Sequence, residues 1–178
     1  MHGDGFEEPT LTFISPDVSG RAHSLLEAGH ELDPVRLDED RFNEIGLFSP
    51  DGHALRFLEA RTFSPLGAND VPKTAIGQIA EVSLRCPDHD VTTAFWERVD
   101  FITDDDDGTP DDGLVVMRAP GMALGLRDDL RWAEPALRFV QDDIAQTLET
   151  LDRLDVAYRR QGDVHLVTAP EGTRLLLL

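Results

Sequence analysis

Residues 48–60 read FSPDGHALRFLEA, and residues 168–178 read TAPEGTRLLLL. In both stretches a Pro, an acidic residue and a Gly give a turn signal, and an apolar segment follows. Pro presets the φ angle of such a turn, and Gly tolerates its tight geometry. The recurrence predicts a repeated unit that ends in a turn and a strand.

Working outward from these turns gives the same order of elements, β-α-β-β-β, in both places. The first copy covers residues 9–60, with a helix over 18–29 and strands at 10–15, 32–37, 43–48 and 54–60. The last copy starts near residue 135, and Asp142 and Asp143 are candidate caps for its helix. Its predicted strands are at 135–140, 155–161, 164–168 and 173–178.

A third copy lies between these two, within residues 78–127. It has a predicted strand at 78–85, a helix at 89–98, a possible strand at 99–103 and a hairpin formed by residues 113–119 and 122–127. Residues 61–77 contain two prolines, two glycines and no clear period, so we interpret them as a linker. The expected organisation is a single unit at 9–60 followed by a two-unit domain at 78–178.

Composition and charge narrow the possible partners. The chain has 178 residues, 40% of them hydrophobic, a formal net charge of −19 and a single cysteine. A chain this acidic repels phosphate backbones and anionic membranes. Nucleic-acid and membrane binding are therefore not expected. No apolar run is long enough for a membrane helix, and the first residues have no secretory pattern. These features favour a cytoplasmic protein.

The repeated unit resembles the modules of the vicinal oxygen chelate superfamily, which includes glyoxalase I, bleomycin-resistance proteins and extradiol dioxygenases. The residues that carry the resemblance are AEVSLRCPDHDVTTAFW at 80–96, SPDGH at 49–53 and APEGT at 169–173. The resemblance implies an α+β fold in which paired βαβββ modules form a curved mixed sheet around a cavity. It also implies metal ligands of the His, Gln or Glu type on the first and last strands of a module.

The positions that match those ligand slots are mostly unsuited to a metal. They fall on Thr10, Arg56, Glu81, Ala136, Leu176 and, in an uncertain register, Gly125. Only Glu81 is a good ligand, whereas a bound divalent metal normally needs about three protein donors. We therefore expect no cofactor, with a divalent metal at Glu81 as the alternative.

Strand alternation places other side chains on the same face as these slots. Arg85, Arg138 and Arg174 are expected there together with Ser83, and arginine grips a carboxylate or phosphate well. A small anion could therefore bind, with Glu81 as an alternative partner for a buried arginine. Equally, the arginines could reach solvent and pair with nearby acidic residues. His165 is a weak candidate for a general base on this face.

Three functions follow from these observations. The first is metal-free binding of a small molecule, for which an anion is one option, by a glyoxalase/bleomycin-resistance-like protein. The second is a metal-dependent lyase, isomerase or dioxygenase, as the resemblance alone implies. The third is a structural or interaction protein whose cavity is filled by side chains.

The three-module count also predicts an oligomer. The first module has no second module to pair with, so we expect it to form a homodimer interface. A four-module ancestor without its opening module would present the same surface, which dimerisation would cover equally well.

Overall fold

The computed structural model describes residues 9–38, 42–60, 74–104, 114–128 and 134–178. The chain divides into two compact units, Met1–Pro65 and Leu66–Leu178, called unit 1 and unit 2 below. Most of the predicted linker, residues 61–73, lies outside the described residues. No helix in the described ranges is long and apolar enough to cross a membrane.

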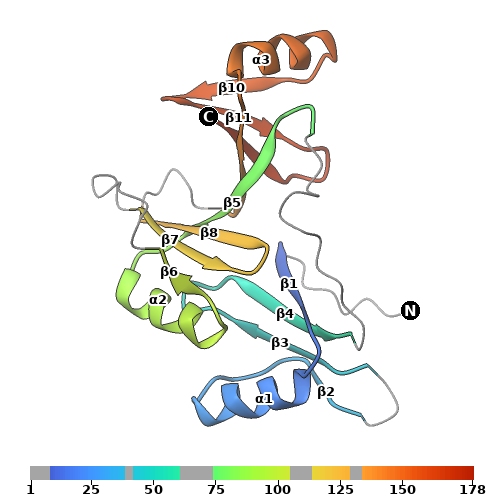
Figure 1. The fold of residues 1–178 in the computed structure, drawn as a ribbon, viewed down its shortest axis with the longest axis vertical. Coiled ribbons are helices and arrows are strands. Elements are labelled where there is room, and N and C mark those ends of the chain that lie inside the picture. The colour runs from blue at the N-terminus through green and yellow to red at the C-terminus, as the bar shows by residue number, and fades with distance from the viewer. Residues whose placement is uncertain (1–8, 39–41, 61–73, 105–113, 129–133) are drawn as a thin grey trace. The chain divides into compact units, whose positions relative to one another are not determined.

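Unit 1 is one βαβββ module (Figure 1). Its elements are β1 (Thr10–Ser15), α1 (Val18–Glu27), β2 (Val35–Arg36), β3 (Glu44–Phe48) and β4 (Ala54–Glu59). The four strands form a sheet in the order β1-β4-β3-β2, in which β1 is parallel to β4. Val18, Ala22 and Leu25 of α1 are buried, so the helix covers one face of this sheet.

Unit 2 contains two more modules joined in one sheet. The first has β5 (Gln78–Arg85), α2 (His89–Arg98), β6 (Ile102–Thr103), β7 (Leu114–Ala119) and β8 (Met122–Arg127). The second has β9 (Ala136–Val140), α3 (Ile144–Arg153), β10 (Tyr158–Gln161), β11 (Val164–Thr168) and β12 (Arg174–Leu177). The strand order is β10-β11-β12-β9-β5-β8-β7-β6.

The two modules of unit 2 meet through their first strands. Strand β5 pairs antiparallel with β9 and parallel with β8, and β9 pairs parallel with β12. Figure 1 shows the long strand β5 running from the half that contains α3 to the half that contains α2. The predicted α+β class and the mixed sheet of paired modules are therefore confirmed.

The two turns that open the sequence analysis have the same geometry. The Ser49 N–H donates to the His53 carbonyl at 2.9 Å, and the Ala169 N–H donates to the Thr173 carbonyl at 2.9 Å. Gly52 and Gly172 have φ angles of +85° and +96°, a region that favours glycine. In both modules, the repeated sequence makes a turn that leads into the last strand.

Three aspartates begin the three helices in the same way. The side chains of Asp17, Asp88 and Asp143 accept a hydrogen bond from the backbone N–H three residues later. These caps satisfy a donor that the helix itself leaves unpaired. Of the two candidates for the last helix, Asp143 is the cap.

Three predicted strands are shorter in the structure by at least three residues. The segment 32–37 retains only β2, although Asp33 and Pro34 still exchange backbone hydrogen bonds with Gly46. The segments 99–103 and 155–161 begin with a turn, because Asp100 and Asp155 have positive φ angles. A positive φ takes a residue out of the strand conformation, so β6 and β10 start later than predicted.

Candidate functional site

The sheet of unit 2 has two chemically different faces. Phe139, Val167 and Leu177 pack with Leu151 of α3 in one buried cluster. Ala136, Leu166 and Leu176, which alternate with them along the same strands, form a separate buried cluster. We call the face of Ala136, Leu166 and Leu176 the inner face; it lies opposite α3.

Cross-strand register extends the inner face over β5 and β8. Ser83 of β5 lies opposite Ala136 on one side and Gly125 on the other. Glu81 lies opposite Arg138, after an irregularity in β5 between Ile79 and Glu81. Arg85 lies opposite Arg127. Side chains directly opposite each other point to the same side of a sheet, so these residues share the inner face.

Glu81 is the centre of a polar cluster on this face. Its side chain is only 5% exposed. Oε1 accepts hydrogen bonds from the Ser83 hydroxyl at 2.8 Å and from Nη2 of Arg127 at 2.7 Å. Oε2 accepts one from Nη1 of Arg138 at 3.3 Å. A buried carboxylate needs such compensation, and two guanidinium groups and a hydroxyl provide it.

Gly125 makes room for the Glu81 carboxylate. A Cβ atom built on Gly125 would lie 2.3 Å from Oε1 and 2.5 Å from the carboxyl carbon of Glu81. Ordinary carbon–oxygen contacts are longer than this, so only a glycine at this position leaves the carboxylate in place. The predicted ligand slot at Gly125 therefore has no side chain, because the Glu81 carboxylate occupies the space in which one would lie.

Arg138 has a donor that the cluster does not use. Its Nε atom is buried and has no hydrogen-bond partner among the described residues, while Nη1 binds Glu81. A buried guanidinium N–H without an acceptor costs free energy, so this donor calls for an acceptor that the described residues do not supply. Arg85 lies two residues after Ser83 on β5 and adds a third guanidinium group to the same face.

The site does not fit a divalent metal. No group of three His, Cys, Asp or Glu side chains within the described ranges could hold a metal ion. Both carboxylate oxygens of Glu81 already bind donors, and Ala136 and Leu176 occupy other slots with hydrocarbon. A dication here would also lie beside two guanidinium charges, which repel it.

Two other predicted site residues, Arg174 and His165, do not take part in the Glu81 cluster. Arg174 is on the inner face, but its Nε pairs with Glu134 at 2.8 Å. This is the pairing with a nearby acidic residue that we considered as the alternative to ligand binding.

His165 is on the opposite face. It alternates with Leu166, and its ring packs edge-on against Tyr158, which belongs to the α3 cluster. The expectation that His165 could face the cavity is therefore corrected.

Arg127 was not among the predicted site residues. This residue is two positions after Gly125, so strand alternation places both on one face. Fixing the register of that slot, which the sequence left uncertain, would have identified Arg127.

A similar arrangement occurs in unit 1. The carboxylate of Glu44 accepts a hydrogen bond from Nη1 of Arg36 at 3.1 Å and also pairs with Arg56. Arg56 occupies the closing-strand slot of this module, so here that slot holds a guanidinium group. Both described units thus neutralise a buried glutamate with two arginines on neighbouring strands.

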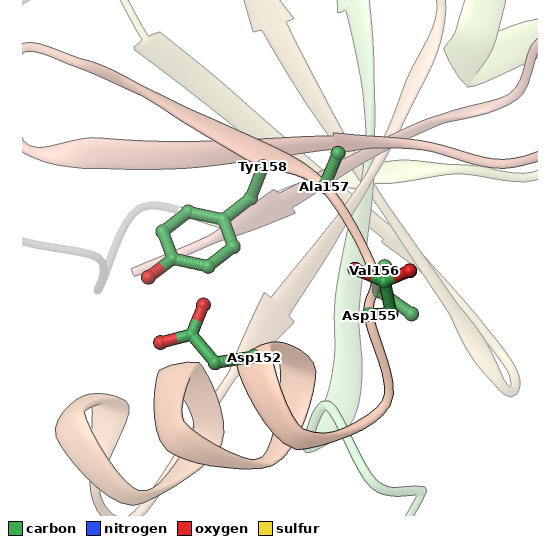
Figure 2. Close-up of a pocket in the computed structure, with 5 residues that line it drawn as sticks. All are labelled: Asp152, Asp155, Val156, Ala157 and Tyr158. Atoms are coloured by element: carbon green, nitrogen blue, oxygen red, sulfur yellow. The ribbon is translucent and has the colours of Figure 1, made fainter.

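A shallow depression lies on the α3 side of unit 2. It is lined by Asp152, Asp155, Val156, Ala157 and Tyr158. Figure 2 shows the Asp152 carboxylate facing the Tyr158 hydroxyl. Partial burial raises the pKa of Tyr158 above 10.0, and the charge of Asp152 and a hydrogen bond to it raise it further. This depression is separate from the Glu81 cluster, and its two carboxylates would repel an anion.

Comparisons with known proteins give a fold but no close relative. No protein-family model matches the chain. No curated protein matches it either. Among solved structures, a catechol 2,3-dioxygenase superposes with a TM-score of 0.62 and 15% identity over 99% of this chain and 70% of its own. The chain therefore has the fold of the extradiol dioxygenases.

Two further structures support the same fold. The 2,2',3-trihydroxybiphenyl 1,2-dioxygenase from Sphingomonas wittichii gives a TM-score of 0.58 and 14% identity, over 94% of this chain and 68% of its own. A Mn(II)-bound glyoxalase from Novosphingobium aromaticivorans gives 0.57 and 16%, over 94% and 60%. The predicted resemblance to the vicinal oxygen chelate superfamily is confirmed as a fold, and this chain spans only part of each neighbour.

Proposed function

We propose that the chain binds a small anion on the inner face of unit 2 without a metal ion. The observation that carries this proposal is the buried, unused Nε donor of Arg138 beside the Glu81 cluster. The guanidinium groups of Arg85, Arg127 and Arg138 lie on this face together with the carboxylate of Glu81. Glu81 binds two of these guanidinium groups, in a chain of net charge −19.

The chemistry of the cluster selects the ligand class. Guanidinium groups match the planar, two-oxygen geometry of carboxylates and the oxygens of phosphates. Glu81 occupies one terminal nitrogen of Arg127 and one of Arg138. A ligand carboxylate would accept from the Nε edge of Arg138 and extend toward Arg85. The ligand is therefore a carboxylate or phosphate compound small enough to lie across β5 and β9.

The test is binding of defined anions to the full chain. Acetate, succinate and inorganic phosphate are titrated by calorimetry, and the shift of the thermal unfolding midpoint is recorded, since a ligand of the folded state raises it. We expect at least one anion to bind saturably. We expect Arg138→Gln to weaken that binding at least about tenfold, the cost of one charge-assisted hydrogen bond.

Arg153→Gln is the matched control. Arg153 is exposed on α3, on the opposite side of the sheet, and loses the same charge. It should leave anion binding unchanged. Equal weakening by both substitutions would reduce the effect to net charge and contradict a site at Arg138.

A structural role is the second candidate, and one observation favours it. Ala136, Leu166 and Leu176 are nearly fully buried, so hydrocarbon already fills the part of the inner face next to Arg138. If no carboxylate or phosphate binds, the Glu81 cluster serves only to hold β5, β8 and β9 together.

The metal-dependent lyase, isomerase or dioxygenase reading rests on fold alone. Its test is the metal content of protein purified without chelator or metal-affinity resin, before and after incubation with iron, manganese, zinc or nickel. Stoichiometric metal that is lost in Glu81→Gln would support it and would contradict the metal-free proposal.

A further inference from the structure

The edge strands of the two described sheets differ in how well they are protected against pairing with a further strand. Strands β2 and β6 have two residues each, and β10 has four, of which two are arginines. Strand β1 has six residues, TLTFIS, with no charge and no proline. Short length, charge and proline are the usual defences against edge-to-edge pairing, and β1 has none of them.

The backbone of β1 presents hydrogen-bonding groups at its outer edge. The Ala60 N–H donates to the Ser15 carbonyl at 3.1 Å, so the backbone groups of Ser15 point toward β4. Alternate residues of a strand point their backbone groups to opposite sides. The N–H and C=O groups of Thr12 and Ile14 therefore point away from β4. Both side chains are also exposed, that of Ile14 by 40%.

Unit 2 shows how such a strand is paired within this fold. Strands β5 and β9 are the first strands of their modules, and they pair antiparallel with each other through the edges that face away from β8 and β12. Strand β1 is the first strand of its module and is parallel to β4 as β9 is to β12. The structurally equivalent partner of β1 is thus another first strand in antiparallel orientation.

We infer that β1 pairs antiparallel with β1 of a second copy of this chain. A two-fold axis at Phe13 places Thr12 of one copy opposite Ile14 of the other, and both are residues whose backbone groups point outward. Residues opposite each other in such a pair exchange both N–H···O bonds. Threonine and isoleucine also suit cross-strand contact. The interface is isologous, so it closes as a dimer.

Charge gives this dimer a distinctive salt dependence. Each chain carries a net charge of −19, whereas β1 itself is uncharged. Two copies repel each other over long range while their strands attract at short range. Added salt screens the repulsion, so association should strengthen as the salt concentration rises. A dimer held by complementary charges would weaken instead.

The experiment is sedimentation of the full chain across micromolar concentrations at low and high salt. We expect a monomer–dimer equilibrium that shifts toward dimer with salt. Thr12→Pro, which removes an outward N–H while leaving the bonds to β4, should give a monomer at both salt concentrations. Ile14→Lys should weaken the dimer at least about tenfold, while Thr168→Lys, at an exposed threonine of the interior strand β11, should not.

Hydrogen exchange on the unmodified chain keeps the test independent of variants that fail to fold. The amides of Thr12 and Ile14 should be protected in concentrated samples and exchange rapidly on dilution. A chain that stays monomeric at all concentrations and salts would overturn the inference. So would a dimer in which these two amides remain unprotected.

Discussion

The Glu81 carboxylate shows how one residue can change the chemistry available to a fold. It occupies the strand position where the resemblance places a metal ligand, but its oxygens bind Ser83, Arg127 and Arg138. The positive charge next to Glu81 comes from two arginine side chains, which stay protonated at physiological pH. A carboxylate that is held in this way stabilises the arginines and also competes with any anion for them.

Glu81→Gln should separate these two effects. The substitution removes the Glu81 carboxylate from Arg127 and Arg138, which are 13% and 27% exposed, and should lower the free energy of unfolding by about 3 kcal/mol. The same change should tighten anion binding, because the internal competitor is gone. Urea unfolding and calorimetry give the two readings.

The surface pair of His23 and Glu27, 3.2 Å apart, provides the control for this substitution. Glu27→Gln should change stability by less than about 0.5 kcal/mol, because both side chains are exposed. Weaker anion binding in Glu81→Gln would show that Glu81 contributes to the ligand site instead of competing with it.

Gly125→Ala should destabilise the fold by about 1–3 kcal/mol, because the new Cβ would displace the Glu81 carboxylate from its donors. A double-mutant cycle with Glu81→Ala checks the cause. In the Glu81→Ala background the added methyl group has space, so its cost should largely disappear. An equal cost in both backgrounds would mean that Gly125 is required for its backbone instead.

At the scale of elements, local signals in the sequence predicted more than long-range register did. The turns at Gly52 and Gly172 and the cap at Asp143 depend on residues within a few positions, so the sequence contains their full cause. The face of the sheet on which His165 lies and the contact of Arg127 with Glu81 both depend on how distant strands align. A shift by one residue reverses the face of every side chain, and a single sequence does not fix that alignment.

The cap of α3 gives a prediction at this scale. Asp143→Ala should lower the free energy of unfolding by about 1 kcal/mol, because the Gln146 N–H loses its acceptor at 3.1 Å. Asp143→Asn should retain most of the stability, since asparagine caps helices equally well. Urea unfolding compares the two variants. If Asn were as damaging as Ala, the carboxylate charge would matter more than the hydrogen bond.

The contact between α3 and β10 has its own spectroscopic reporter. Tyr158 is the single tyrosine of the chain, so tyrosinate absorbance follows it alone. We expect it to ionise above its ordinary pKa of 10.0, because partial burial and Asp152 favour the neutral phenol. Asp152→Asn should bring the pKa closer to 10.0, whereas Asp155→Asn, in the same depression, should change it less.

The pH dependence of stability follows with a definite sign. The folded chain holds the Tyr158 proton more tightly than the unfolded chain does. Its contribution to stability is therefore complete below about pH 10 and is lost as the pH rises through the raised pKa. A Tyr158 that ionises below pH 10 would contradict the contact with Asp152.

At the scale of the whole molecule, the three described modules have the same order of elements but differ in how their first strands are paired. Unit 2 pairs its two first strands within the chain, and for unit 1 we infer that a second copy supplies the partner. Each described unit buries a glutamate between two arginines. The net charge of −19 repels anions in proportion to their charge, so the site that we propose favours a ligand that carries few charges.

The most direct test of the central claim follows the side-chain Nε–H signal of Arg138 by nitrogen-15 NMR during titration with succinate. We expect a saturable shift of this signal that is absent for Arg153 and larger at equal succinate in Glu81→Gln. An Arg138 signal that stays constant through titrations with succinate, acetate and phosphate would contradict an anion site on the inner face. The Glu81 cluster would then be structural.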